Sequence, residues 1–146
     1  MLKILIPVDG SELALLAVHH ALTLCGWGLK ARFVVANVQS PANLYELMVA
    51  HDPTVLQQVS EAAGRDLMRP AVQLLQAAGQ SVDQDVATGD PSHTLIELVE
   101  RHACDAIILS AHGSSGFRGQ LGKVAHELVQ SSPVPVTVVR SPDADE

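Results

Sequence analysis

Four glycines mark one short stretch of the chain, SAHGSSGFRGQLGK, which follows the apolar run DAIIL. They are Gly113, Gly116, Gly119 and Gly122. Glycine costs a helix or strand interior ~1 kcal/mol relative to alanine, so the cluster indicates a loop with positive φ angles or a close backbone approach. Residues 106–126 also contain Arg118 and Lys123 and no carboxylate, in a chain of net charge -7. This pattern is typical of a phosphate-binding loop, and an ordinary surface loop stays open as the alternative.

Other nucleotide and catalytic motifs are absent from the sequence. GFRGQLGKV is not a Walker A loop, because Phe117 stands where that motif needs a glycine and Val124 where it needs Ser or Thr. No GxGxxG follows the first apolar run, so a Rossmann dinucleotide site is not expected. The sequence also lacks a GxSxG elbow or another visible catalytic constellation, and we do not expect an enzyme.

Single polar residues near the ends of the apolar runs are further candidates. Asp9 precedes Gly10, where a carboxylate either accepts a hydrogen bond from a ligand amine or caps a turn. His112 either lines a ribose or phosphate site or packs beside the loop. The other histidines show no metal-ligand spacing, so no metal site is expected. Cys25 and Cys104 form no disulfide framework and are expected to be small buried groups.

The composition limits the classes of function. The 146 residues suffice for one domain, and 47% of them are hydrophobic. Aromatic residues make up only 3%, and the charge balance is acidic, so no nucleic-acid partner is expected. Pro7 and Asp9 interrupt the first apolar run, so we expect no secretory signal, and no stretch is long enough to span a membrane. A cytoplasmic protein without membrane contact is the expectation.

Strands and helices that could position these residues alternate along the chain. Apolar runs predict strands at residues 2–9, 31–38, 81–87, 105–110 and 134–140. Caps and helical spacing predict helices at residues 11–24, 53–78, 90–102 and 123–131, and one short turn is expected near 44–49. Pro70 predicts a kink or break near residues 66–70 of the long helix. Pro135 predicts either that the last strand lies at a sheet edge or that the proline lies in its first residues.

This alternation predicts an α/β fold with an open, doubly wound parallel sheet and helices on both faces. Ligands bind such sheets beyond the carboxyl ends of the strands, where the strand order reverses. The first and fourth strands are the natural pair at that point. Their ends carry PVDGS and SAHGSSG, so the glycine loop lies where a ligand belongs.

Four segments resemble the universal stress protein family over nearly the whole chain. They are KILIPVDGSELALLAV, GDPSHTLIELV, CDAIILSAHGSSG and GKVAHELVQSSPVPVTVV, and the resemblance weakens only across residues 40–80. It implies a single domain over residues 1–146, with a five-stranded parallel sheet in the order 3-2-1-4-5. It also implies a homodimer. The apolar residues Val134 to Val139 form an edge strand that would aggregate unless paired, so the last strand is the expected interface.

The resemblance further implies a site for ATP, with or without Mg²⁺. Family members that bind ATP carry a glycine, two residues, a second glycine, nine residues, and then Gly-Ser or Gly-Thr. Gly113 and Gly122 match this pattern. The sequence departs from it in three ways, because Ser110 replaces the first glycine, only eight residues separate Gly113 from Gly122, and Lys123 replaces the hydroxyl residue. Lys123 can bind phosphate through its charge instead.

By the same resemblance, Asp9 and Val38 contact adenine, Pro7 and Val8 form its aliphatic wall, and the start of the last helix holds phosphates. The full set of candidate nucleotide-binding residues is Pro7, Val8, Asp9, Val38, Leu109, Ser110, His112, Gly113, Gly116, Gly122, Lys123 and Val124. Two functions stay open. The protein is either an ATP-binding regulator, in which hydrolysis would be slow and incidental, or a nucleotide-free dimeric interaction module with protein partners that the sequence does not identify.

Overall fold

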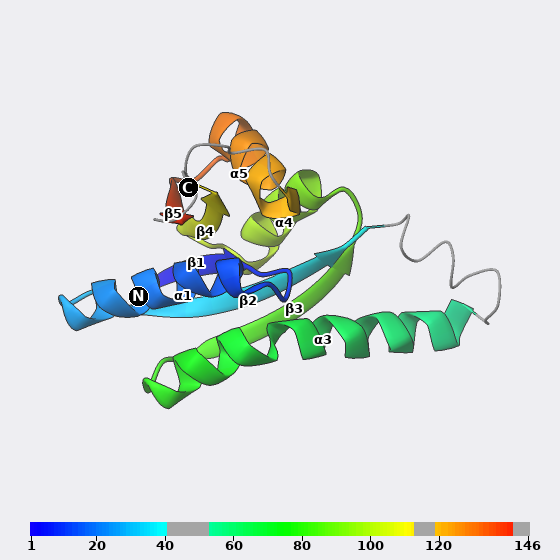
Figure 1. Ribbon diagram of the computed structural model, residues 1–146, viewed down its shortest axis with the longest axis horizontal. Helices are drawn as coiled ribbons and strands as arrows, with labels where there is room; N and C mark the ends of the chain where they lie inside the picture. Colours follow the sequence, from blue (N-terminus) through cyan, green and yellow to red (C-terminus); the bar gives the residue numbers. More distant parts are fainter. Residues whose placement is uncertain (41–52, 113–118, 142–146) are drawn as a thin grey trace.

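The computed structural model describes residues 1–40, 53–112 and 119–141. Five parallel strands form one sheet in the order β3-β2-β1-β4-β5 (Figure 1). They are β1 (Leu2–Pro7), β2 (Ala31–Gln39), β3 (Val82–Thr88), β4 (Ala106–His112) and β5 (Val136–Ser141). The predicted strand order is confirmed. It places β3 and β5 at the two edges, as the alternation of polar residues in β3 and Pro135 before β5 predict.

Helices cover both faces of the sheet, so the doubly wound fold is also confirmed (Figure 1). The helices are α1 (Glu12–Gly26), α3 (Pro53–Ala77), α4 (Pro91–His102) and α5 (Gly119–Ser131). Helices α1 and α3 pack on one face, and α4 and α5 pack on the other. The turn predicted near residues 44–49 lies outside the described residues.

Strands β1, β2 and β4 bury both of their faces, which explains their nearly continuous apolar sequences. In β2, Phe33 and Val35 join the core cluster under α1 and α3, whereas Val34 and Ala36 join the cluster under α4 and α5. Because successive side chains alternate between faces, residues two apart in a strand share one cluster. Each strand therefore supplies side chains to two separate cores.

Helix α3 continues through Pro70, so of the predicted kink or break the break does not occur. Proline removes one backbone donor and clashes with the carbonyl group of the preceding turn. Pro70 is exposed, so solvent can hydrate that carbonyl group, while the neighbouring residues Met68 and Ala71 are buried in the core. The packing on both sides of Pro70 keeps the helix continuous.

The first residues of two helices agree with the predicted capping residues, whereas a third helix begins earlier than predicted. The side chain of Ser11 accepts from the Ala14 amide at the start of α1, and Asp90 caps α4 with Pro91 in its first turn. Helix α5 begins at Gly119, four residues before the predicted start at Lys123. The helix thus includes two of the glycines that predicted a loop.

The two cysteines are free thiols on opposite sides of the sheet. Cys25 packs at the margin of the α1–α3 cluster, and Cys104 is buried in the α4–α5 cluster. Burial raises the pKa of both thiols. Cys104 is buried as expected, whereas Cys25 is only half-buried.

Within residues 1–40, 53–112 and 119–141, none of the helices combines the length and apolar character that a membrane crossing needs.

Candidate functional site

The strand order reverses at β1, which lies between β2 and β4. The register between β1 and β4 pairs Ile4 with Ala106 and Leu5 with Ile107, near the start of each strand. Strands β1 and β2 pair along the whole of β1. The carboxyl ends of β1 and β4 therefore flank the crevice where an open α/β sheet binds its ligand.

A small cavity lies beside this crevice, on the α4–α5 side of the sheet. It is lined by Pro7, Val8, Asp9, Ala36, Val38, Pro91, Leu95 and Val124. Five of these residues belong to the set predicted from the sequence, and they come from β1 and its following turn, β2 and α5. The lining is apolar except for one carboxylate, which suits a flat ring that carries an amine.

Asp9 caps the turn after β1 and also lines the cavity. Its Oδ1 accepts hydrogen bonds from the Ser11 amide at 3.0 Å and from the Ser11 hydroxyl at 2.6 Å. This is the turn-capping arrangement. Among the described residues both bonds reach Oδ1, so Oδ2 keeps its capacity to accept from a ligand while Asp9 lines the cavity.

Gly10 makes the turn that takes Asp9 off the end of β1. Its φ is 88°, a value that L residues with a side chain rarely adopt. A Cβ at this position would also collide with the side chain of Leu67 on α3. The turn that follows Asp9 therefore depends on glycine.

Two of the predicted residues of β4, Leu109 and Ser110, face opposite sides of the sheet. Leu109 is fully buried in the α4–α5 cluster, on the same side as the cavity. The Ser110 hydroxyl instead accepts from the Ala17 amide of α1 at 2.8 Å. Although Ser110 replaces a family glycine, its side chain points away from the cavity, and only its backbone continues towards the loop.

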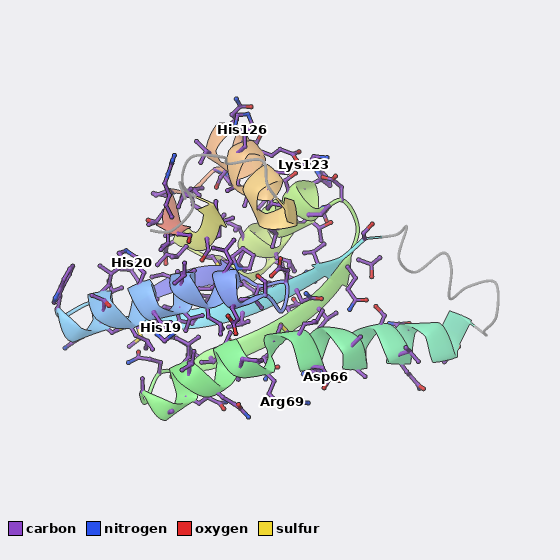
Figure 2. All side chains as sticks on the ribbon, viewed as in Figure 1. His19, His20, Asp66, Arg69, Lys123 and His126 are labelled. Atoms are coloured by element: carbon purple, nitrogen blue, oxygen red, sulfur yellow. The ribbon has the colours of Figure 1, made fainter. Side chains whose placement is uncertain are left out.

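The predicted residues of α5 differ in exposure. Gly122 is buried, Val124 lines the cavity, and Lys123 is exposed. Figure 2 shows Lys123 on the half of α5 that lies nearer its start. Because α5 begins at Gly119, Lys123 lies beyond the first helical turn, where the free backbone amides are. Lys123 can therefore bind an anion through its ammonium group but not through its backbone amide.

Three members of the predicted set cannot be placed in full. His112 is the last residue of β4 and pairs with Ser141 of β5. Its side chain lies outside the described part of the structure, as do Gly113 and Gly116. Their assignment to the site stays a prediction.

Sequence reasoning missed Ala36, Pro91 and Leu95. The period-two alternation of β2 places Ala36 on the same face as Val38, so this residue was within reach of the pattern. Pro91 was also within reach, because the Asp90–Pro91 pair predicts the start of α4 and so the position of its first turn. Only the packing of α4 against β2 reveals that Leu95 also faces the cavity.

Carboxylates from two helices lie close to the cavity lining. The Ser92 hydroxyl donates to Glu127 Oε2 of α5 at 2.9 Å and lies 3.2 Å from Asp90 Oδ2. This contact joins the start of α4 to α5 next to Pro91 and Val124. The described residues contain no group of three or more His, Cys, Asp or Glu side chains that could hold a metal ion.

Comparison with known protein families assigns the chain to one of them. The model of the universal stress protein family matches residues 1–140. The chain belongs to this family. Universal stress protein MJ0531 of Methanocaldococcus jannaschii is 24% identical to it over 141 residues, which cover 96% of this chain and 82% of that protein.

Solved structures share the fold of this universal stress protein. The structure of hypothetical protein MJ0577 is 24% identical, has a TM-score of 0.76, and is matched over 97% of both chains. A universal stress protein family protein from Arabidopsis thaliana, solved with AMP bound, is 19% identical with a TM-score of 0.71, over 98% of this chain and 94% of that one. The cavity described above therefore lies in a fold that holds an adenine nucleotide in another family member.

Proposed function

We propose that this universal stress protein binds an adenine nucleotide, ATP or a relative of ATP, at the carboxyl ends of β1 and β4. The observation that carries the proposal is the shared cavity of Val8, Asp9, Val38 and Val124, which come from three separate parts of the sequence and meet on one lining. Apolar walls around one carboxylate match an adenine ring whose exocyclic amine donates to Asp9. The AMP-bound relative supports the same ligand class.

The proposed role is regulatory binding, in which the nucleotide acts as a signal rather than as a substrate. The residues near the cavity offer binding groups, namely apolar walls, Asp9, and the ammonium group of Lys123 for a phosphate. The cavity measures about 30 Å³. Side-chain rearrangement of its lining, which is common at interfaces on binding, would give the base more room.

A nucleotide-free interaction module is the second candidate. The observation that favours it is the engagement of Asp9 Oδ1 by Ser11, which gives this carboxylate a structural role without any ligand. Mass spectrometry of small molecules released from the purified, denatured protein separates the two candidates. ATP or AMP in the released material supports the nucleotide proposal, and its absence together with failure of added nucleotide to bind supports the module.

Exchange of one atom in Asp9 tests the proposed contact with the base. In Asp9→Asn, Oδ1 can still accept from Ser11, but an amide donor replaces Oδ2. The amide donor of the variant would then face the exocyclic amine of adenine, which is also a donor. We expect adenosine to bind about ten-fold to a hundred-fold more weakly, since a hydrogen bond to a charged group contributes about 1.5–3 kcal/mol.

Inosine, whose ring carries an acceptor in place of the amine, should bind Asp9→Asn better than adenosine does. Glu12→Gln is the matched control, because it removes a carboxylate nearby that does not line the cavity. Calorimetric titration of the three proteins with both nucleosides gives the comparison. An unchanged preference for adenosine in Asp9→Asn would contradict the proposed contact.

A further inference from the structure

The end of β1 is held by a side chain as well as by the sheet. The register between β1 and β2 ends with Pro7 opposite Ala36, and the Val8 amide still donates to the Ala36 carbonyl oxygen at 2.9 Å. The Val8 carbonyl oxygen accepts from Asn37 Nδ2 at 3.0 Å. Asn37 thus adds a hydrogen bond where β1 passes into the Asp9–Gly10 turn.

This hydrogen bond lies directly behind the cavity. Val8 and Asp9 form one part of the lining, and Ala36 and Val38, the neighbours of Asn37 in β2, form another. Because strand side chains alternate, the Asn37 side chain lies on the opposite face, where α3 packs. Asn37 therefore connects the two strands that make one side of the site without reaching the ligand position itself.

The other end of the same amide is unsatisfied. Asn37 is only 3% exposed, and among the described residues its Oδ1 has no hydrogen-bond partner. Its neighbours are Gly64 of α3 and Val86, which is opposite Asn37 in β3. A Cβ built on Gly64 would lie 3.2 Å from Oδ1 and 2.6 Å from a Val86 methyl group, so the space is tight and apolar.

A buried carbonyl group without a partner destabilises a fold, and a β-branched apolar residue suits a buried strand better than asparagine does. Among the described residues, the bond to Val8 is the only hydrogen bond of the Asn37 side chain. What the polar side chain contributes at this position is therefore the hydrogen bond that holds the end of β1.

We propose that Asn37 is a positioning residue for nucleotide recognition. Its amide fixes the Val8 carbonyl group, and thereby sets the position of Val8 and Asp9 relative to Val38 on the other side of the cavity. This inference rests on the proposed nucleotide function. Because Asn37 acts through the residues that face the base, it influences every ligand that carries adenine to the same extent, whatever the number of phosphates.

The test is calorimetric titration of Asn37→Val with adenosine and with ATP, alongside thermal unfolding. We expect both dissociation constants to rise by the same factor, about ten-fold for one lost hydrogen bond of about 1.4 kcal/mol. The melting temperature should change little, because the variant removes the unsatisfied Oδ1 but leaves the buried Val8 carbonyl group without its partner. Asn37→Ser, whose hydroxyl is too short to replace the amide, is a second variant with the same expected loss of affinity.

Val86→Ala is the matched control. It loosens packing beside Asn37 but leaves the bond to Val8, so it should lower the melting temperature and leave both affinities unchanged. Equal affinities of Asn37→Val and the wild-type protein would overturn the positioning role. So would a loss of affinity in Val86→Ala as large as in Asn37→Val, since the effect would then follow packing alone. If the wild-type protein binds neither ligand, the proposed nucleotide function itself fails.

Discussion

At the residue scale, two side chains near the cavity each use one polar atom to hold the backbone, and their other polar atom has no hydrogen-bond partner among the described residues. Asp9 binds Ser11 through Oδ1, and Asn37 binds the Val8 carbonyl group through Nδ2. The unused Asp9 Oδ2 belongs to a residue that lines the cavity, whereas the unused Asn37 Oδ1 is buried against α3. Asp9 is thereby suited to contact a ligand, and Asn37 to orient the chain that does so.

Lys123 is the residue whose role depends most on the phosphates. It is exposed, and among the described residues no carboxylate forms an ion pair with it. A charged contact with phosphate contributes about 1.5–3 kcal/mol, so Lys123→Ala should weaken ATP binding by about ten-fold to a hundred-fold. Adenosine, which has no phosphate, should bind both proteins alike.

Calorimetric titration of the wild-type protein and Lys123→Ala with ATP and adenosine measures this difference. Arg101→Ala is a suitable control, because it removes a positive charge near Asp85 of β3, away from the cavity lining. Equal ATP affinities of the wild-type protein and Lys123→Ala would show that Lys123 is only a solvated surface residue.

At the element scale, much of the site followed from the order of strands and helices. Alternating elements predict a doubly wound sheet, and its switch point brings Val8, Asp9 and Val38 to one edge. The direction of Ser110 could not be predicted in this way. Both faces of β4 are buried, so its continuous apolar sequence does not indicate which side chains face α1 and which face α5.

The observed start of α5 also differs from the start that the local glycines predict. Glycine disfavours helices, and the cluster around Gly119 and Gly122 therefore predicted a loop up to Lys123. The α5 residues Val124, Ala125 and Leu128 are buried in the α4–α5 cluster. Most helical stability in proteins comes from such packing rather than from propensity, which accounts for a helix that includes both glycines.

The turn between β1 and α1 gives a prediction at this scale. Gly10→Ala should destabilise the protein by about 1–2 kcal/mol, because alanine disfavours a positive φ and its Cβ would displace Leu67. Displacement of this turn should also weaken adenosine binding, since Asp9 precedes it. Thermal unfolding and titration of the variant measure both effects.

Gly26→Ala is the control for this substitution. Gly26 ends α1 without a positive φ, and a Cβ there would meet nothing within 4 Å. Alanine should therefore leave stability unchanged or raise it by up to about 1 kcal/mol. A Gly10→Ala protein as stable as Gly26→Ala would show that the turn tolerates a side chain.

At the scale of the whole molecule, the two sheet edges differ in character. Edge strand β3 carries Asp83, Gln84 and Asp85, which discourage pairing with another sheet. Edge strand β5 carries Val136, Val138 and Val139, all half-buried in one chain. We propose that two chains pair through β5, along Val134 to Val139, to form a homodimer.

Sedimentation equilibrium should therefore give a dimer at micromolar concentration. The Pro135 carbonyl oxygen accepts from the Ile107 amide of β4, and backbone groups alternate in direction along a strand, so the Val138 amide points away from β4. Val138→Pro should weaken the dimer while the β4–β5 pairing stays intact. A wild-type protein that sediments as a monomer would contradict the proposed interface.

Equilibrium dialysis of the wild-type protein against labelled ATP, with unlabelled adenosine and AMP as competitors, tests the central claim most directly. The proposed cavity recognises the base, so the account predicts one saturable ATP site per chain from which both competitors displace the label. ATP that stays bound in excess adenosine would place recognition away from the base and contradict the role of Val8, Asp9 and Val38. No saturable binding of ATP would contradict the nucleotide function as a whole.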